Sequence, residues 1–575
     1  MVTLPDLLHP VPLARVDLGL VREALGFAFS GGGSDVTSHQ LFEPKGGSPS
    51  TWTPDHFERD LFLDTFVATH AQVVVAGQRR VLSAGQLHQL LQRPPSDPEV
   101  TRFRQHVLHE LVSVPAYREA LEHSYLLLLE VRASLSESGV GHRLDLNRRR
   151  IDILVGWQKL IDHFAGSFEG ARSGLSRLAT FGTEVAATEG HARLLKLLEL
   201  EDGRAALDVR LRIGYDGQLR HFEIVRVTEQ TLNPFYATNL GRFVRKLWLF
   251  VRGYRFSDAE VLSRFVDQVF EGIENELARM FQLLSDLEFY LSALSFRDTA
   301  QRHGLAVCLA SFVAPKRGSP ATAGRTLIGL FNPLLLGSDI EPTPCTLEQS
   351  LQNQTVVLTG PNSGGKTRLL QALSLAQLLG QCGYFVPAAS AQLVWAHAMF
   401  VSISEASHAG QREGRLGMEL MRIRSVFESA RLGAFVVVDE LCSGTNPGEG
   451  EEIFEMVLSL LRELDAQAFV STHFLQFAQR LAASTERVSR YGMQFLQVEL
   501  DGRQSPTYQF VPGVAQSSLA HLTASRLGVT RDELAALVAR HKGAARHARS
   551  ELPLAVRQGE RLEGMALRGA KERPA

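Results

Sequence analysis

The sequence predicts a mostly α-helical region followed by an α/β domain with a mainly parallel sheet and helices on both faces. Apolar residues recur at helical spacing over much of the chain between Asp55 and residue 300. After about Leu305, short β-rich runs alternate with helical patterns, an order typical of a parallel sheet. A chain of 575 residues is also too long for one ordinary core. We therefore expect separate parts over residues 1–54, 55–300, 301–540 and 541–575.

The composition is that of a globular protein with no overall attraction to a polyanion. The chain is 45% hydrophobic and 21% charged, and its formal net charge is −2. Any contact with nucleic acid must therefore come from local basic patches. The four cysteines are far apart and lack the C-x-x-C spacing of a zinc or redox site. The start of the chain lacks a signal-peptide pattern, and no stretch of 18 apolar residues occurs, so we expect a cytoplasmic protein without a membrane span.

The first half of the chain is predicted to be a linker followed by helices. The segment from Ser30 to Pro54 is rich in Gly, Ser and Pro and is expected to separate a short N-terminal piece. Helical spacing follows from Asp55 to about Glu137, including the run FERDLFLDTFVATHAQVVV, and again over Ile151–Phe181.

A β-hairpin is predicted within this helical region. Residues alternate in polarity from Ala206 to Val227, around the turn dipeptide Asp216-Gly217. Two more helical patterns follow, over Leu240–Arg252 and Asp258–Phe296. A hairpin set among long helices suggests an extended arm.

The strongest local motif lies in the run TVVLTGPNSGGKT, where a strand ends in a glycine-rich loop and a helix follows. It fits the pattern G-x-x-x-x-G-K-[ST] and predicts a P-loop NTPase domain. The nucleotide-binding residues are then Gly360, Pro361, Asn362, Ser363, Gly364, Gly365, Lys366 and Thr367. Backbone N–H groups would wrap the phosphates, Lys366 would reach the β- and γ-phosphates, and Thr367 would be a ligand of Mg²⁺. A plain glycine-rich turn is the alternative, but the order of strand, loop and helix favours the P-loop.

Two further strand ends carry candidate catalytic groups. The run AFVVVDEL puts Asp439 and Glu440 at the end of an apolar strand, where Asp439 would hold magnesium and Glu440 would polarise the attacking water. Such a pair is often only a helix cap, and the phosphate loop nearby favours the catalytic interpretation. The run AFVSTH ends at His473, which would sense the γ-phosphate or position water, a structural histidine being the alternative.

These motifs resemble the ATPase domain of the MutS family. GPNSGGKT, GYFVPA, VVVDELCSGTNPGEG and STHF occur in the family's order, and MQFLQVELDGRQSPTYQFVPGVAQSSLAHLTASRLGV resembles the hairpin, Pro-Gly turn and dimerising helices that close that domain. The resemblance implies ATP and Mg²⁺ as cofactors, a homodimer, and a helical lever and clamp that encircle nucleic acid, DNA above all. The segment Phe331-Asn332-Pro333 resembles the family's approach to the nucleotide pocket.

The sequence departs from the mismatch-repair members in several places. The run DELCSGTNPGEG is closer to the second MutS subfamily, which acts in recombination control or on ribosomes. No Phe-x-Glu wedge motif occurs, so we expect a MutS-related protein lacking the mismatch-recognition domain, and the residues after Arg540 leave no room for a nuclease-like Smr domain. Gly417 stands near the serine of the family's loop that reaches the partner's nucleotide, placed here at Gly414–Glu419, which puts hydrolysis across a dimer in question.

Two basic clusters are candidate contacts with nucleic acid. One cluster contains Arg242, Arg245, Lys246, Arg252 and Arg255, and the other is Arg148–Arg150. They would touch phosphates, or they are solvated helix faces paired with acids. Residues 541–575 are predicted to be a basic, flexible tail.

The function predicted from these features is an ATP-dependent DNA-binding protein of the MutS type. ATP binding and hydrolysis would be coupled to clamp movement on mismatched, branched or damaged DNA, in repair or recombination. The alternatives are an ATP-gated factor acting on ribosomes or RNA, and a nucleotide-switched protein scaffold.

Overall fold

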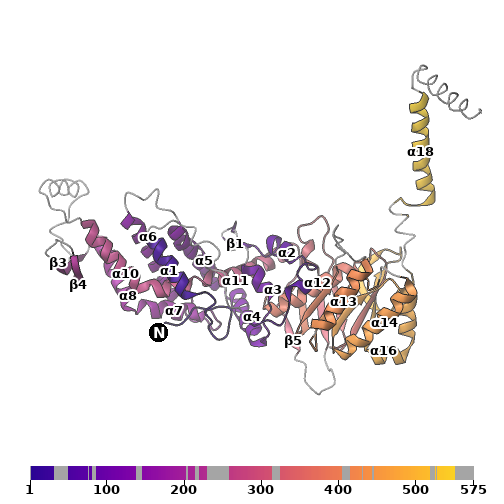
Figure 1. Ribbon diagram of the computed structural model, residues 1–575, viewed down its shortest axis with the longest axis horizontal. Helices are drawn as coiled ribbons and strands as arrows, with labels where there is room; N and C mark the ends of the chain where they lie inside the picture. Colours follow the sequence, from indigo (N-terminus) through magenta and orange to yellow (C-terminus); the bar gives the residue numbers. More distant parts are fainter. Residues whose placement is uncertain are drawn as a thin grey trace, which may run out of the picture.

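The chain is elongated, with a helical region at one end and an α/β domain at the other (Figure 1). The coordinates come from a computed structural model. The structure describes residues 2–30, 49–75, 77–80, 86–136, 146–201, 205–213, 219–229, 258–313, 324–351, 353–403, 415–429, 431–442, 446–517, 525 and 528–550. Within these residues, no helix is long and apolar enough to cross a bilayer.

The helices of the helical region pack around one apolar core. Its helices are α1 (Leu18–Phe29), η3 (Pro54–His56), α2 (Leu63–Thr69), α3 (Gln86–Gln92), α4 (Pro98–Ser113), α5 (Pro115–Ser136), α6 (Leu146–Ser167), α7 (Ser176–Ala186), α8 (Glu189–Glu201), α10 (Asp258–Met280) and α11 (Leu283–Arg302). In α11, every residue from Leu283 to Phe296 is buried, so this part of the helix is surrounded by other elements on all sides.

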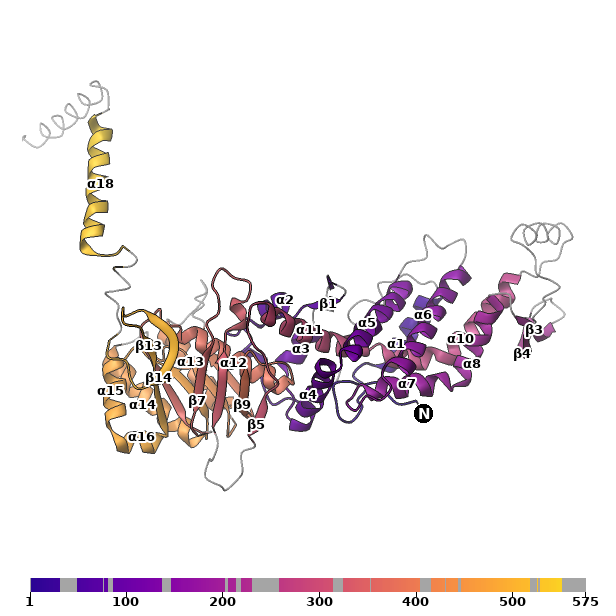
Figure 2. The same cartoon turned by 180° about the vertical axis from the view of Figure 1, so that it is seen from behind.

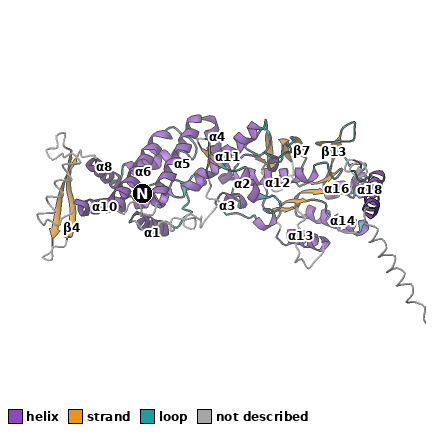
Figure 3. Cartoon of the chain, turned by 90° about the horizontal axis from the view of Figure 1, so that it is seen from above, coloured by secondary structure: helices purple, strands orange, loops and turns teal. Residues whose placement is uncertain are grey.

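A two-stranded antiparallel hairpin lies at the end of the molecule farthest from the α/β domain (Figure 3). Its strands are β3 (Ala205–Ile213) and β4 (Leu219–Glu229), which correspond to the alternating segment of the sequence. The expected helix over Leu240–Arg252 lies outside the described residues.

The N-terminal residues, which were expected as a separate short piece, pack against the helical region. Leu7 and Leu8 are fully buried in the core shared with the helices, and α1 packs against α10 and α5. Arg15 pairs with the buried carboxylate of Asp286 on α11. Buried apolar side chains and a buried ion pair hold this segment in the helical region. The glycine-rich stretch after Ser30 gave no indication of this packing in the sequence.

Two of the predicted helical segments have a different secondary structure from the one expected. The run Val73–Val75 is strand β1, paired with β2 (Gln78–Arg80) through a turn in which Gly77 has φ 74°. Three consecutive β-branched residues before such a turn favour a hairpin over a helix. The pattern over Asp258–Phe296 is two helices, because the chain turns at Phe281 and Gln282, where the Gln282 side chain binds the N-terminal segment.

The α/β domain is built on a six-stranded sheet in the order β10-β11-β12-β8-β13-β14. The strands are β8 (Thr355–Thr359), β10 (Met399–Ser402), β11 (Phe435–Val438), β12 (Gln467–Ser471), β13 (Met493–Leu500) and β14 (Pro506–Pro512). All neighbours are parallel except β13 and β14. The mainly parallel sheet predicted from the alternating pattern is therefore present.

Helices cover this sheet on both faces, as Figure 2 shows from the side of β13 and β14. The helices are α12 (Lys366–Cys382), α13 (Arg415–Ser429), α14 (Pro447–Glu463), α15 (Leu475–Ala483) and α16 (Thr485–Tyr491). Alternate residues of β11 enter different cores: Phe435 and Val437 pack with α12, whereas Val436 and Val438 pack with α14. Strands buried on both faces explain why these runs are continuously apolar in the sequence.

A second, four-stranded sheet adjoins the first and was not predicted as a unit. Its order is β5-β9-β6-β7, with strands β5 (Ser311–Val313), β6 (Arg325–Leu330), β7 (Cys345–Gln349) and β9 (Ser390–Val394), and the short 3-10 helix η4 (Pro333–Leu335) follows β6. At the C-terminus, α18 (Arg531–Ser550) stands apart from the sheets in both side views (Figures 1 and 2). This helix extends to Ser550, inside the stretch 541–575 predicted to be flexible, because its Ala- and Arg-rich sequence favours a helix.

Candidate functional site

The glycine-rich loop joins β8 to α12 at the carboxyl edge of the parallel sheet. Gly360 has φ 144° and Gly365 has φ 84°, conformations that residues with a Cβ rarely adopt. A Cβ at Gly360 would lie 2.6 Å from Cγ2 of Val498 on β13, and one at Gly364 would lie 2.8 Å from the same atom. The loop thus depends on glycine for its shape and for its close approach to β13.

Lys366 is the first residue of α12 and is folded back over the loop. Its Nζ donates hydrogen bonds to the carbonyl oxygens of Gly360 at 2.9 Å and Pro361 at 3.0 Å. Burial lowers the pKa of this ammonium group, and the carboxylates of Glu440 and Asp439 act in the opposite direction. The positive charge of Lys366 therefore lies inside the loop and faces both acids.

Asp439 connects the loop to the neighbouring strands. Its Oδ2 accepts a hydrogen bond from Oγ1 of Thr367 at 2.5 Å, and its Oδ1 accepts one from Oγ of Ser471 at the end of β12. The sequence motifs at Thr367 and Asp439, 72 residues apart, are thus in direct contact. Ser471 was not singled out from the sequence, although it begins the STHF motif.

Glu440 and His473 follow the ends of β11 and β12. Glu440 has a positive φ of 54°, and its backbone N–H donates to Oγ of Ser471 at 2.8 Å. The His473 side chain is exposed, with its ring centroid 4.2 Å from that of Phe474. Both residues therefore lie at the same sheet edge as the glycine-rich loop.

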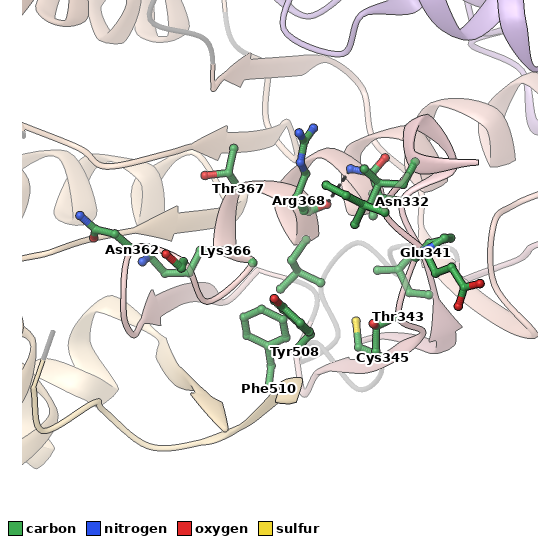
Figure 4. Close-up of a pocket in the computed structure, with 18 residues that line it drawn as sticks. Asn332, Glu341, Thr343, Cys345, Asn362, Lys366, Thr367, Arg368, Tyr508 and Phe510 are labelled. Carbon is green, nitrogen blue, oxygen red and sulfur yellow. Dashed lines mark hydrogen bonds between the residues drawn. The ribbon is translucent and has the colours of Figure 1, made fainter. Parts of the chain in front are cut away.

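A cavity of about 380 Å³ opens beside the loop and extends toward the second sheet (Figure 4). It is lined by residues from the end of β6, η4, the segment that leads into β7, the start of β7, the loop, α12 and β14, namely Leu330, Asn332, Leu335, Ile340, Glu341, Pro342, Thr343, Cys345, Asn362, Ser363, Gly365, Lys366, Thr367, Arg368, Leu369, Ala372, Tyr508 and Phe510. Its size falls in the usual range for small-molecule sites.

Tyr508 and Phe510 form an aromatic wall of this cavity that sequence reasoning did not find. Figure 4 shows both on the opposite side of the cavity from Asn332 and Arg368. Tyr508 has φ 60°, and a Cβ at Gly365 would lie 3.0 Å from its Cδ1. Asn332, which the sequence did indicate, is fixed by hydrogen bonds to the carbonyl of Arg368 and the side chain of Gln371.

The segment expected to reach across a dimer is only partly described. Gly414 lies outside the described residues, whereas Gly417 and Glu419 lie in the first turns of α13. The Glu419 carboxylate accepts a hydrogen bond from the backbone N–H of Cys442, which has φ 62°. This contact joins α13 to the turn that follows Glu440.

In the basic cluster Arg148–Arg150, two of the three side chains are buried and make contacts within the helical region. Arg149 is buried and donates to the carbonyls of Ala28 and Leu135. Arg150 is buried too and pairs with Asp267 at 3.0 Å, while Arg148 is exposed near Asp152. The predicted solvated face paired with acids fits Arg148 alone, because Arg149 and Arg150 are buried. Arg242, Arg245, Lys246, Arg252 and Arg255 lie outside the described residues.

The residues of the site fit a nucleotide with magnesium. The loop packs against Val498 too closely for a Cβ at Gly360 or Gly364, and it lies at the N-terminus of α12, where N–H groups and the helix dipole favour anions. Thr367 and Asp439 offer adjacent oxygen donors of the kind Mg²⁺ prefers. The described residues contain no group of three or more His, Cys, Asp or Glu suited to a metal, so magnesium here would also need phosphate or water ligands.

Comparisons with known proteins agree on one family. Residues 356–536 match the model of the family MutS domain V. The chain is 33% identical over 224 residues to Endonuclease MutS2 of Thermus thermophilus, covering 39% of this chain and 27% of that protein. It is 26% identical over 350 residues to the Gemmatimonas aurantiaca protein of the same name (60% and 40% covered) and 30% identical over 362 residues to that of Agathobacter rectalis (59% and 42% covered). The chain thus spans less than half the length of each of these relatives.

Proposed function

This chain belongs to the MutS family through the match at residues 356–536, and on that premise we propose that it is a DNA-associated ATPase. The observation that supports this most directly is the contact of Thr367 with Asp439, which joins the phosphate loop to the strand that ends in Glu440. These are three of the parts that phosphoryl transfer to water requires: a phosphate cradle, metal ligands and a carboxylate beside them.

Each residue then has a distinct role. The backbone of Gly360–Gly365 binds the phosphates, and Lys366 turns from the loop carbonyls to neutralise their charge. Thr367 and Asp439 would hold Mg²⁺, which would neutralise charge on the phosphate oxygens. Glu440 accepts a proton from the attacking water, and His473 positions that water or contacts the γ-phosphate.

The cavity next to the loop would take the nucleoside. Tyr508 supplies a flat, half-exposed ring beside Gly365, suited to stacking on a base. Asn332, whose hydrogen bonds tie η4 to α12, keeps the opposite wall in place. The assignment of ATP rests on the family.

The role of DNA is proposed from the relatives and from the shape of the chain. The relatives are named endonucleases, and the chain carries a long helical region that ends in the β3–β4 hairpin. We propose residues 55–300 as the lever and clamp, residues 301–540 as the ATPase unit, and dimerisation through the segment after β14. Movement of the clamp on branched, damaged or mismatched DNA would require that its affinity for DNA differ between nucleotide states.

The test is ATP turnover of the purified chain with duplex, branched and single-stranded DNA at two salt concentrations. A Glu440→Gln variant keeps the shape of the side chain and removes the base, so it should bind ATP and lose most turnover. Stimulation of the wild-type chain by one form of DNA, weaker at high salt, is the expected result. Turnover that is equal in the wild type and in Glu440→Gln would refute the ATPase assignment, and turnover indifferent to every DNA would refute the DNA role.

A further inference from the structure

Ser471 contacts three successive residues of the candidate catalytic strand end. It is the last residue of β12 and is fully buried. Its Oγ donates to Oδ1 of Asp439 and accepts from the backbone N–H of Glu440 at 2.8 Å. Its carbonyl oxygen accepts from the N–H of Leu441 at 3.3 Å. The hydroxyl group and the carbonyl oxygen of Ser471 thus hold the three residues that directly follow β11.

In these hydrogen bonds the Ser471 hydroxyl group acts as a donor and as an acceptor at the same time. A serine hydroxyl has a single O–H to donate and lone pairs to accept with. At Ser471 the donor goes to a carboxylate and a lone pair receives an amide, so each bond fixes the direction of the other. Alanine can make neither bond, whereas threonine can make both.

The carboxylate of Asp439 is oriented at both of its oxygens. Oδ1 faces Ser471 and Oδ2 faces Thr367, so a hydroxyl stands on each side of the group. If Ser471 lost its hydroxyl, the hydrogen bond from Thr367 would be the one left on the Asp439 carboxylate among the described residues. Groups that orient a metal ligand in this way commonly control metal affinity.

The backbone of Glu440 is held in a costly conformation. Its φ of 54° lies in the left-handed region, which a residue with a side chain adopts only when its surroundings impose it. The bond from its N–H to Ser471 is one such constraint, and it aims the Glu440 side chain relative to Asp439.

We propose that Ser471 is a positioning residue that fixes the magnesium-binding carboxylate of Asp439 and the backbone of the water-activating Glu440 together. The inference rests on the proposed ATPase function and names a residue of that site which acts through its neighbours. It predicts that the Ser471 hydroxyl sets both the magnesium requirement and the rate of hydrolysis, while magnesium-free nucleotide binding, which uses the loop, depends on it little.

The experiment compares the full chain with Ser471→Ala, Ser471→Thr and the control Ser374→Ala. Ser374 is also fully buried in this domain, but its hydroxyl donates to the carbonyl of Leu370 within α12 and touches no site residue. Binding of a fluorescent ADP analogue is titrated with and without Mg²⁺, turnover of ATP is measured across Mg²⁺ concentrations, and thermal unfolding confirms that each variant is folded.

Loss of a group that orients a metal ligand typically weakens metal affinity about 10- to 100-fold. We therefore expect Ser471→Ala to raise the half-saturating Mg²⁺ concentration by about tenfold or more and to lower turnover, with magnesium-free binding of the analogue within about twofold of wild type. Ser471→Thr should recover most of the Mg²⁺ affinity, and Ser374→Ala should match the wild type.

Two results would overturn the inference while the ATPase assignment stands. One is a Ser471→Ala variant with wild-type Mg²⁺ dependence and turnover. The other is a Ser471→Thr variant that binds Mg²⁺ as poorly as Ser471→Ala, since the hydroxyl would then not be the cause. A wild-type chain that shows no Mg²⁺-dependent nucleotide binding and no turnover would instead refute the proposed function itself.

Discussion

At Tyr508, backbone strain and the proposed stacking on a nucleotide base can be measured separately. It lies in β14 where the register against β13 shifts between Val498 and Leu500, and its φ is 60°. A left-handed conformation costs a residue with a Cβ roughly 1–2 kcal/mol, a cost that glycine does not have. The side chain is 46% exposed, beside Gly365 and the cavity.

Replacement of Tyr508 by Ala and by Gly should therefore lower nucleotide affinity equally but change stability by different amounts. Both variants lose the ring, which as a stacking partner is worth about 1–3 kcal/mol, so nucleotide affinity should fall about 5- to 150-fold in each. Only Gly relieves the left-handed strain, so Tyr508→Gly should be more stable than Tyr508→Ala by about 1 kcal/mol. Tyr508→Phe keeps the ring and should bind nucleotide nearly as well as wild type.

The assays are calorimetric titration with MgADP and urea unfolding without nucleotide. An alanine variant with wild-type affinity would show that Tyr508 is not the wall against which the base lies. A glycine variant less stable than the alanine variant would show that the positive φ carries no strain, because glycine is otherwise the worse residue in a strand.

Three more perturbations test the packing around the site and the helical region. Asp286→Ala leaves the guanidinium of Arg15 buried without its carboxylate, so it should cost about 3–5 kcal/mol in urea unfolding, unless the N-terminal segment is held by its apolar residues alone. Gly360→Ala sets a Cβ against Val498 and at a φ of 144°, so MgADP affinity should fall at least about tenfold, and unchanged affinity would mean that the loop shape is unimportant. Burial lowers the pKa of His70 from 6.5 to about 4. As pH falls, His70 is therefore protonated in the unfolded chain before it is protonated in the folded one, so the free energy of unfolding should fall between about pH 6.5 and about pH 4. His70→Gln should make the free energy of unfolding depend less on pH in this range. Identical pH profiles of the variant and the wild type would contradict this prediction.

Sequence reasoning located those parts of the site that local pattern determines. The glycine-rich loop is contiguous, and Asp439, Glu440 and His473 each follow an apolar run that had to be a parallel strand. Parallel strands end at one edge of a sheet, so such residues come close together, and Asp439 does contact Thr367.

Features that depend on long-range register escaped the same reasoning. Tyr508 reaches the loop only because β14 bulges where it pairs with β13, a displacement that no alternation pattern records. Ser471 has its role because β12 lies directly beside β11, which fixes which residue faces Asp439. The burial of Arg149 could not be predicted either. A run of arginines indicates positive charge, but it does not show which carbonyl groups accept hydrogen bonds from the guanidinium.

The helix α12 links the candidate site to the helical region. It begins at Lys366 and spans 17 residues, about 25 Å at the usual rise. Its last turn is held by α4: Oγ1 of Thr101 donates to the carbonyl of Gln381 at 2.6 Å, and Arg104 donates to that of Cys382 at 3.0 Å.

Arg104 also connects α12 to the N-terminal segment. The same guanidinium donates through Nε to the carbonyl of Leu8 at 3.1 Å, so one buried cation holds two segments distant in sequence. A Cβ at Gly383, just after α12, would lie 2.8 Å from Cβ of Arg104, which leaves no free space at this junction. Close-packed contacts transmit displacement because they cannot be compressed. Any shift of α12 along its axis at Lys366 must therefore move α4 and the N-terminal segment with it, or break these hydrogen bonds.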